Sequence, residues 1–326
     1  MMQKQILAAG IFILSLMFPL KVSAKNYDEI YVFGDSFSDT SNVSNATNEA
    51  IPPSPPYFNG RFSNGQVWVE YLASDLGLTF NSKTNFAFGG ATTGVDNIGL
   101  ASLPGLQQQI NSFTVANRSA DPNSLYIIWA GTNDYLKYFF NTVPDPTQVV
   151  TNLSVAVKSL AAVGAKDIMV VNQPNLGEFP VTNGSSQISS LLSTFTNAHN
   201  SILSANLSFL KQQLSPDINI IPLDVNSLFN RIIAHPDEFG FTNVTDSCIG
   251  DLSVIPINLP TQSITCTPDQ FVFWDQIHPT TATHKLIGEL AFSTLQSASV
   301  PESSTVLGVL LFGALGQVSL MKGKKL

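Results

Sequence analysis

The chain has 326 residues, of which 44% are hydrophobic and 12% are charged, so it can bury a large core and is not expected to be disordered. Its net charge is −8 at pH 7, and residues 25–299 alone carry 10 basic and 22 acidic side chains, hence −12. This acidity argues against nucleic acid or anionic lipid headgroups as partners, since phosphate binding depends on Lys and Arg. It is compatible with a soluble exported enzyme.

Residues 1–24 have the layout of a secretory signal peptide. Lys4 precedes an almost uncharged apolar stretch, residues 6–20, and the small residues Ser23 and Ala24 follow it. A membrane-spanning anchor fits less well, because the apolar stretch is shorter than about 18 residues. We expect signal peptidase to cleave after Ala24 and the protein to be exported.

Between the two ends of the chain, strand-like and helix-like patterns alternate. In chain order we predict a strand at 30–33, a Pro-rich loop at 39–64, a helix at 66–76, a strand at 125–130, a helix at 147–163, a strand at 167–171, a helix at 188–214, a strand at 218–223, and helices at 228–234 and 281–295. This alternation indicates a mainly parallel sheet that is covered on both faces. Neither a repeat nor a linker divides the region, which predicts one domain over residues 25–299.

A Gly-Asp-Ser stretch directly follows the first predicted strand. Gly34 ends the apolar run, so Ser36 is expected at the carboxyl end of a strand, where open α/β sheets bind their ligands. A serine at this edge is a candidate nucleophile. It needs a base that takes its proton and donors that hold a developing oxyanion.

The base can be found nearly by elimination, because the chain has four histidines. His199 lies inside a helical pattern, His235 precedes a proline in a loop, and His284 falls in the last helix, so all three are interpreted as structural. His278 differs, since Asp275 stands three residues before it. A short turn can place this carboxylate against imidazole Nδ1 and leave Nε2 to accept a hydroxyl proton.

Donors for an oxyanion hole are expected from three segments. Ser36 can offer its own backbone N–H, and Gly90 can offer a second from a turn in which no side chain blocks the approach. Asn133, which follows the strand predicted at 125–130, can add its side-chain amide. Each motif alone is common, and it is their order at the ends of strands that makes the set specific.

With these motifs the chain resembles the SGNH, or GDSL-type, esterase/lipase family over about residues 28–296. The matching segments are the nucleophile block at 33–39, a following segment at 60–65, the glycine block at 85–91, the asparagine block at 131–134 and the Asp-His block at 275–279. Phe37 stands where the family signature usually has Leu, a change of size that we expect to pack beneath the turn. The Gly-x-Ser-x-Gly elbow of α/β-hydrolases does not occur.

The resemblance implies a flavodoxin-like, three-layer α/β/α sandwich with a mainly parallel five-stranded sheet. It also implies a serine ester hydrolase that forms an acyl-enzyme and needs neither a cofactor nor a metal. In that scheme Ser36 is the nucleophile, His278 the base and Asp275 its orienter. Gly90 and Asn133 join the backbone N–H of Ser36 in the oxyanion hole, although the adjacent Gly89 could replace Gly90.

The natural substrate is left open by the sequence. The family resemblance permits lipid and small-molecule esters, and carbohydrate acetylesterase or thioesterase activity is an alternative. A non-catalytic surface or matrix protein on the same fold is a second class of function. Aromatic residues near the motifs fit an apolar acyl pocket or ordinary core packing equally well: Tyr57, Phe58, Trp68, Tyr135, Tyr138, Phe139, Phe140 and Trp274.

Cys248 and Cys266 are the two cysteines of the chain. In an exported protein such an isolated pair is expected to form a disulfide. Two cysteines do not suffice for a structural zinc site, and the chain has no His-Glu-x-x-His motif.

Residues 300–326 combine a short motif, an apolar run and a basic tail. Val300-Pro301-Glu302-Ser303-Ser304 precedes the apolar stretch 306–321, and three lysines follow. The layout resembles a PEP-CTERM sorting signal, although the second proline of its motif is a serine here. We expect transient membrane association, then cleavage by an exosortase-like protease and a final place outside a bacterial cell or on its outer envelope. A plain short anchor is the alternative.

Overall fold

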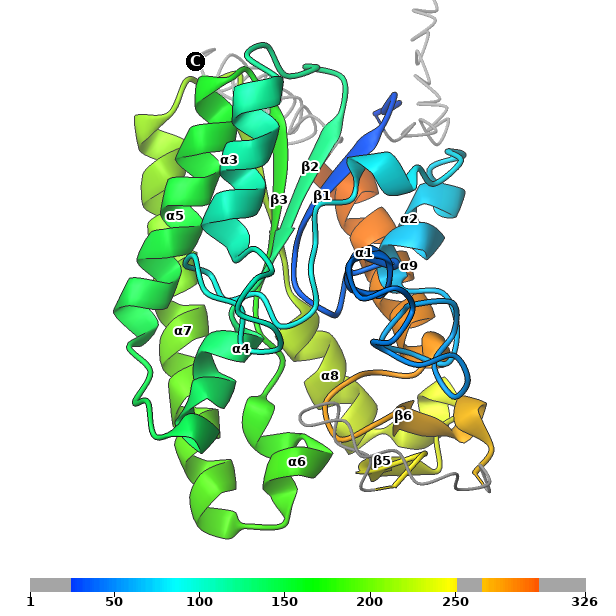
Figure 1. Ribbon diagram of the computed structural model, residues 1–326. Coiled ribbons are helices and arrows are strands. Elements are labelled where there is room, and N and C mark those ends of the chain that lie inside the picture. The colour runs from blue at the N-terminus through cyan, green and yellow to red at the C-terminus, as the bar shows by residue number, and fades with distance from the viewer. Residues whose placement is uncertain (1–24, 251–265, 299–326) are drawn as a thin grey trace, which may run out of the picture.

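Four parallel strands form the main sheet of the protein, as seen in a computed structural model that describes residues 25–250 and 266–298 (Figure 1). They lie in the order in which they occur in the chain: β1 (Ile30–Gly34), β2 (Leu125–Trp129), β3 (Asp167–Val171) and β4 (Asn219–Leu223). All four predicted strands are confirmed. Since the strands are parallel, their carboxyl ends meet at one edge, where the loops that follow β1 and β2 lie side by side.

The fifth strand that we expected is not a regular strand in the described chain. Residues 85–88 lie against the free edge of β1, where the N–H of Phe86 donates to Val32 and that of Phe88 donates to Gly34, at 2.7 and 3.1 Å. The chain then turns at Gly89 and Gly90, which ends the pairing after these two bonds. The expected five-stranded sheet is therefore corrected to four strands plus an irregular edge segment.

Helices cover both faces of the sheet (Figure 1). One face is covered by α2 (Trp68–Asp75), α8 (Val225–Ala234) and α9 (Thr281–Ala298), and the other by α3 (Leu106–Ala116), α5 (Pro146–Ala162) and α7 (Ser186–Gln213). The side chains of β2 alternate between the two cores: Leu125, Ile127 and Trp129 enter the first, Tyr126 and Ile128 the second. The α/β/α sandwich predicted from the family resemblance is confirmed.

The five predicted helices are confirmed to within three residues at each end. The sequence analysis left α3 unassigned, although Leu106, Ile110 and Phe113 recur at helical spacing and are buried. Shorter elements complete the described chain: α1 (Asn42–Ala46), α4 (Thr132–Leu136), α6 (Pro180–Asn183), the strand pair β5 (Asn243–Ser247) and β6 (Phe271–Phe273), and 3-10 turns at Ser82–Thr84, Lys137–Phe140, Leu176–Glu178, Pro236–Phe239 and Pro268–Gln270.

A disulfide joins Cys248 to Cys266, with 5.5 Å between their Cα atoms. Cys248 is buried and Cys266 is half-buried, and both pack with Tyr57, Ile249 and Trp274 in a small apolar cluster. The expected signal peptide and sorting signal lie in residues 1–24 and 300–326, which are outside the described residues. None of the helices that the structure describes is both long and apolar enough to cross a membrane.

Candidate active site

Ser36 and the Asp275–His278 pair, which are far apart in the sequence, form one hydrogen-bonded chain at the carboxyl edge of the sheet. Nε2 of His278 lies 2.8 Å from Oγ of Ser36, and its Nδ1 lies 2.7 Å from Oδ2 of Asp275. All three residues are buried, with exposed fractions of 7% for Ser36, 4% for His278 and 0% for Asp275. A carboxylate that accepts from Nδ1–H leaves Nε2 as an acceptor for the serine hydroxyl. The structure thus brings together the predicted nucleophile, base and orienter.

Ser36 is placed by the tight end of β1. The Cβ that Gly34 lacks would lie 2.0 Å from the carbonyl oxygen of Trp129, so no other residue allows the two strands to come this close. The carbonyl of Asp35 then accepts the N–H groups of Ser38 and Asp39, which closes a helical turn around Ser36. Phe37 is 1% exposed and stacks on Trp129 at 4.9 Å, so it packs beneath the turn as expected.

The Asp-His turn is organised by the carboxylate of Asp275. Its Oδ1 accepts the backbone N–H groups of Ile277 and His278 at 2.8 and 2.7 Å, which holds the turn in shape. Its Oδ2 accepts from His278 Nδ1 and from the hydroxyl of Tyr57, each at 2.7 Å. Burial alone would raise the pKa of Asp275, but the charge of His278 and the hydrogen bonds from His278 and Tyr57 outweigh it and hold that pKa below its usual value.

The predicted oxyanion donors lie on neighbouring segments that are tied to one another, with Asn133 in the first turn of α4. Asn133 donates one amide hydrogen to the carbonyl of Ala91 at 2.9 Å, which joins the asparagine block to the glycine block. The N–H of Gly89 is engaged by Oδ2 of Asp39 at 2.9 Å. Among the described residues, by contrast, nothing accepts a hydrogen bond from the N–H groups of Ser36 and Gly90. These two donors are available to a ligand, so the geometry favours Gly90 over Gly89.

Gly90 itself cannot be replaced without strain. Its φ of +80° lies in the left-handed region, and a Cβ there would meet Oδ1 of Asn97 at 2.5 Å. Asn97 in turn donates to the carbonyl of Gly89 and accepts from Gly99, so it pins the turn from the other side.

Three buried carboxylates that the sequence analysis did not single out anchor these loops. Burial raises the pKa of Asp35 to about 8 and that of Asp39 and Asp134 to about 6 each, although backbone N–H groups pull all three values down. Asp39 accepts the N–H groups of Ser41, Asn42, Val43 and Gly89, while Asp134 accepts the N–H and the hydroxyl of Thr93. The sequence places them inside the motif segments, but nothing local marks their carboxylates for burial.

The other histidines lie away from Ser36, in agreement with their structural interpretation. Nδ1 of His199 lies 2.8 Å from the hydroxyl of Tyr135, and Nδ1 of His284 accepts the N–H of Trp68 at 3.4 Å. Burial lowers the pKa of each to about 3, and the nearby His278 adds to this effect for His284. Both are therefore neutral at pH 7. His235 is exposed at the end of α8.

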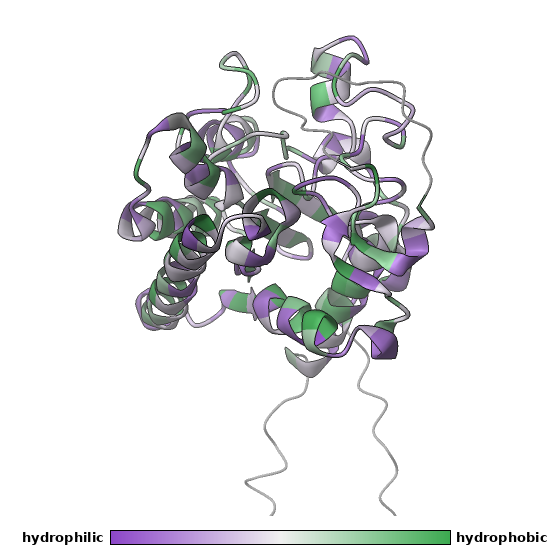
Figure 2. Ribbon diagram, turned by 90° about the horizontal axis from the view of Figure 1, so that it is seen from below, coloured by the Kyte–Doolittle hydropathy of each residue, from purple (hydrophilic) through white to green (hydrophobic). Residues whose placement is uncertain are grey.

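The aromatic residues divide between core and surface. Tyr57, Trp68, Tyr135 and Trp274 are at most 2% exposed and belong to the core or to the cluster beside the disulfide, which is the packing alternative. Phe58 and Phe139 are each 40% exposed. Figure 2 views the protein from below, onto the carboxyl edge of the sheet, and shows hydrophobic and hydrophilic residues interspersed over the loops and short helices there.

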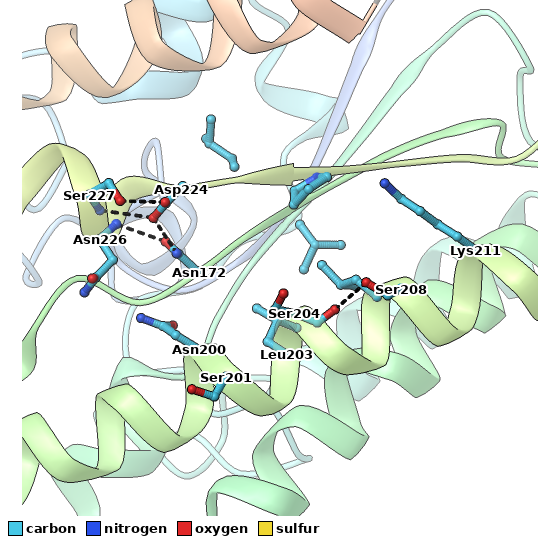
Figure 3. A pocket seen from close by; sticks show the side chains of 14 residues that line it. Asn172, Asn200, Ser201, Leu203, Ser204, Ser208, Lys211, Asp224, Asn226 and Ser227 are labelled. Carbon is cyan, nitrogen blue, oxygen red and sulfur yellow. Dashed lines mark hydrogen bonds between the residues drawn. The ribbon is translucent and has the colours of Figure 1, made fainter.

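A pocket of about 650 Å³ lies beside β4, next to α7 and the start of α8 (Figure 3). It does not include Ser36, Asp275 or His278. Its polar lining is held together internally, since Asn172 donates to Asp224 at 2.7 Å. The lining residues are Val170, Asn172, Asn200, Ser201, Leu203, Ser204, Leu207, Ser208, Lys211, Pro222, Leu223, Asp224, Asn226 and Ser227.

Comparison with known proteins places the chain in a family. A GDSL-like Lipase/Acylhydrolase family model matches residues 30–291. The chain is 29% identical over 313 residues to a phosphatidylcholine-sterol acyltransferase of Aeromonas hydrophila, covering 83% of this chain and 91% of that protein. It is 30% identical over 274 residues to the thermolabile hemolysin of Vibrio parahaemolyticus, covering 80% of this chain and 62% of the hemolysin.

Among solved structures, the M. smegmatis aryl esterase matches with a TM-score of 0.48 and 20% identity, covering 82% of this chain and 98% of that one. By sequence, the chain is also 28% identical over 331 residues to a GDSL esterase/lipase of Arabidopsis thaliana, and this match covers 83% of each chain. The protein therefore belongs to the GDSL-like lipase/acylhydrolase family and is a hydrolase that acts on ester bonds.

Proposed function

We propose that the protein is an exported serine esterase that cleaves carboxylic esters through an acyl-enzyme on Ser36. The observation that carries this proposal is the unbroken chain of hydrogen bonds from Ser36 through His278 to Asp275. A structural protein on the same fold would not need to keep two charge-linked hydrogen bonds buried in this alignment. That arrangement counts against the non-catalytic alternative.

In the first half of the reaction, Oγ of Ser36 attacks the ester carbonyl while Nε2 of His278 takes the hydroxyl proton. Asp275 holds the imidazole by Nδ1 and stabilises the positive charge that forms on it. The carbonyl oxygen becomes an oxyanion, for which the N–H groups of Ser36 and Gly90 and the amide of Asn133 are the donors. The tetrahedral intermediate then collapses, and His278 returns the proton to the leaving alcohol.

In the second half, water takes the place of the alcohol. His278 removes a proton from this water, whose oxygen attacks the acyl carbon and displaces Oγ of Ser36. The acid product leaves, and the proton returns from Nε2 to the serine oxygen, so the enzyme ends as it began. The same residues thus serve both half-reactions, and no electron donor or acceptor is needed.

The test of this proposal uses a fluorophosphonate probe and p-nitrophenyl acetate. The wild-type protein should be labelled at Ser36 and should hydrolyse the ester, whereas Ser36→Ala should do neither. Ser124→Ala is a matched control, because this buried hydroxyl bonds to Asp121 at the opposite edge of the sheet. Labelling of Ser36→Ala at the wild-type level would refute the assignment.

For the substrate, we propose a class of ester and no particular acyl group. Lipid and small-molecule esters are the leading substrates, and two relatives carry names of lipid-directed proteins. Acetylated sugars and thioesters are the alternatives. Rates on p-nitrophenyl esters from two to sixteen carbons would separate the lipid esters from the acetyl esters, since a lipid enzyme should keep or gain rate with chain length and an acetylesterase should lose it.

Export is the remaining part. The pairing of Cys248 with Cys266 supports it, because disulfides persist in oxidising compartments. We propose removal of residues 1–24 by signal peptidase and cleavage near Pro301 by an exosortase-like protease after transient membrane association. Mass spectrometry of the protein purified from its native compartment tests both steps. A mature form that begins at Met1 would contradict the first, and one that ends at Leu326 would contradict the second.

A further inference from the structure

Tyr57 reaches the acidic end of the hydrogen-bonded chain from a distant loop. Its hydroxyl donates to Oδ2 of Asp275 at 2.7 Å, across 218 positions of sequence. Tyr57 is 2% exposed and Asp275 is fully buried. Burial and the nearby carboxylate raise the pKa of the Tyr57 hydroxyl, so it remains a protonated donor. The contact is therefore a dry hydrogen bond to a negative charge, which is the stronger kind.

The hydroxyl shares its acceptor with the base. Asp275 accepts four hydrogen bonds, of which the two from backbone N–H groups fall on Oδ1. The bonds from His278 Nδ1 and from Tyr57 both fall on Oδ2. The hydrogen bond from the tyrosine hydroxyl therefore weakens the electrostatic attraction between Oδ2 and the imidazole.

The position of the hydroxyl is fixed by packing on both sides of the ring. On one side Tyr57 belongs to the cluster with Cys248, Ile249 and Trp274 beside the disulfide. On the other side it meets Phe62 edge-on at 6.4 Å, and Phe62 lies 5.1 Å from the imidazole of His278. The segment that carries Tyr57 and Phe62 thus contacts Asp275 through Tyr57 and His278 through Phe62.

We propose that Tyr57 is a positioning residue that sets how strongly Asp275 pulls a proton onto His278. The inference rests on the proposed esterase function. The Tyr57 hydroxyl disperses part of the negative charge on Oδ2, which weakens the attraction between Asp275 and protonated imidazole. His278 is then neutral, and able to act as the base, down to a lower pH. Removing the hydroxyl should move the acidic limb of activity to higher pH.

Other titratable groups near His278 do not produce this limb. His284, on α9, has its pKa lowered to about 3 by burial and by His278, so it stays neutral over the range measured. Asp35, next to Ser36, has its pKa raised to about 8 by burial and can act only on the alkaline side. Asp275 is bonded to His278 Nδ1 and to the Tyr57 hydroxyl, so the expected direction of the shift follows from this pair of contacts.

The experiment compares Tyr57→Phe with wild type in kcat/KM for p-nitrophenyl acetate between pH 5 and pH 9. We expect the acidic limb of the profile to shift to higher pH by about half to one unit, because one hydrogen bond to a charged group is lost. Tyr126→Phe is the matched control: it also loses a buried hydroxyl, which donates to the carbonyl of Asp121, and its limb should stay in place. In an Asp275→Asn background the effect of Tyr57→Phe should vanish.

A second variant keeps the proposal testable if Tyr57→Phe does not fold. Incorporating 3-fluorotyrosine at position 57 keeps the hydroxyl but makes it a stronger donor, so the limb should move to lower pH. An unmoved limb in folded Tyr57→Phe, or in the fluorinated protein, would overturn the proposal. The esterase proposal fails separately, namely if wild type has no activity that Ser36→Ala removes.

Discussion

The side-chain amide of Gln109 makes two hydrogen bonds with the backbone of Gly34, accepting its N–H at 2.9 Å and donating to its carbonyl at 2.8 Å. Gln109 is 2% exposed and lies on α3, which the sequence analysis did not assign. This clamp holds the end of β1 two residues before Ser36. It therefore links a helix on one face of the sheet to the position of the nucleophile.

Gln109→Leu should destabilise the protein and displace the nucleophile. It leaves the N–H of Gly34 buried without its partner, which costs about 1–3 kcal/mol of unfolding free energy. We expect a lower Tm and a lower kcat together. Gln148→Leu is the control, since that amide is exposed and bonds only to Asn152. A folded Gln109→Leu protein with wild-type Tm would show that the clamp is dispensable.

Asp275→Asn should lower kcat by about four orders of magnitude with little change in fold, because the amide favours the wrong imidazole tautomer and cannot stabilise the imidazolium. Kinetics on p-nitrophenyl acetate and circular dichroism measure the two effects. Wild-type kcat in this variant would mean that Asp275 does not orient His278.

Asn133→Ala should reduce kcat about 10²–10³-fold, the usual cost of one oxyanion donor. KM should change little, because this donor acts mainly on the charge that forms in the transition state. Asn117→Ala is the control: its amide bonds to Phe113 at the end of α3, far from the ester site. Equal losses in both variants would point to a general effect of asparagine removal on folding.

The stability of the protein should depend on Asp35 in a defined direction. The ordinary pKa of this carboxyl is 3.8, and burial raises it to about 8 in the folded chain. Between those pH values only the folded state holds the proton, so the free energy of unfolding falls as pH rises from about 4 to about 8. Asp35→Asn has no carboxyl to titrate in this range. Its free energy of unfolding, relative to that of wild type, should therefore increase by on the order of 3 kcal/mol between pH 5 and pH 8. Thermal melts at both pH values test it, and an unchanged difference would contradict it.

The Cys248–Cys266 disulfide spans 18 positions and should contribute about 3 kcal/mol to stability in the chain-entropy model. The variant with both cysteines changed to serine should melt at a lower temperature, and wild type should fall to a similar value in reductant. Alkylation with and without reductant counts the free thiols. Free thiols in the oxidised protein would refute the pairing.

Sequence patterns were sufficient for the elements whose burial is regular. Each of the four strands contains an apolar run, and α5 ends at Ala162, two residues before Gly164, so apolar runs and helix breakers locate these elements. The three residues of the hydrogen-bonded chain were also predicted, because Ser36 follows a strand and Asp275 stands three residues before His278. The five-stranded sheet implied by the family resemblance was wrong, because only the two backbone hydrogen bonds from Phe86 and Phe88 join the segment 85–88 to β1.

What the sequence could not show are contacts between distant side chains. Gln109 and Tyr57 each bond to a site segment more than 70 positions away. A glutamine in a polar helix and a tyrosine in a Pro-rich loop have nothing local to mark them. Asp35 and Asp39 were read as parts of a motif, and only their burial shows that one stays protonated while the other collects backbone N–H groups.

Ser36 and His278 meet across 242 positions of sequence. A nascent chain that has reached the end of α8 already contains Ser36, Gly90 and Asn133, yet it lacks His278. On the proposed mechanism we therefore expect no ester hydrolysis during synthesis until Asp275 and His278 are present and α9 has packed against α2. Ester hydrolysis by a ribosome-bound chain would accordingly report that α9 has folded, and truncation before Asp275 should abolish turnover.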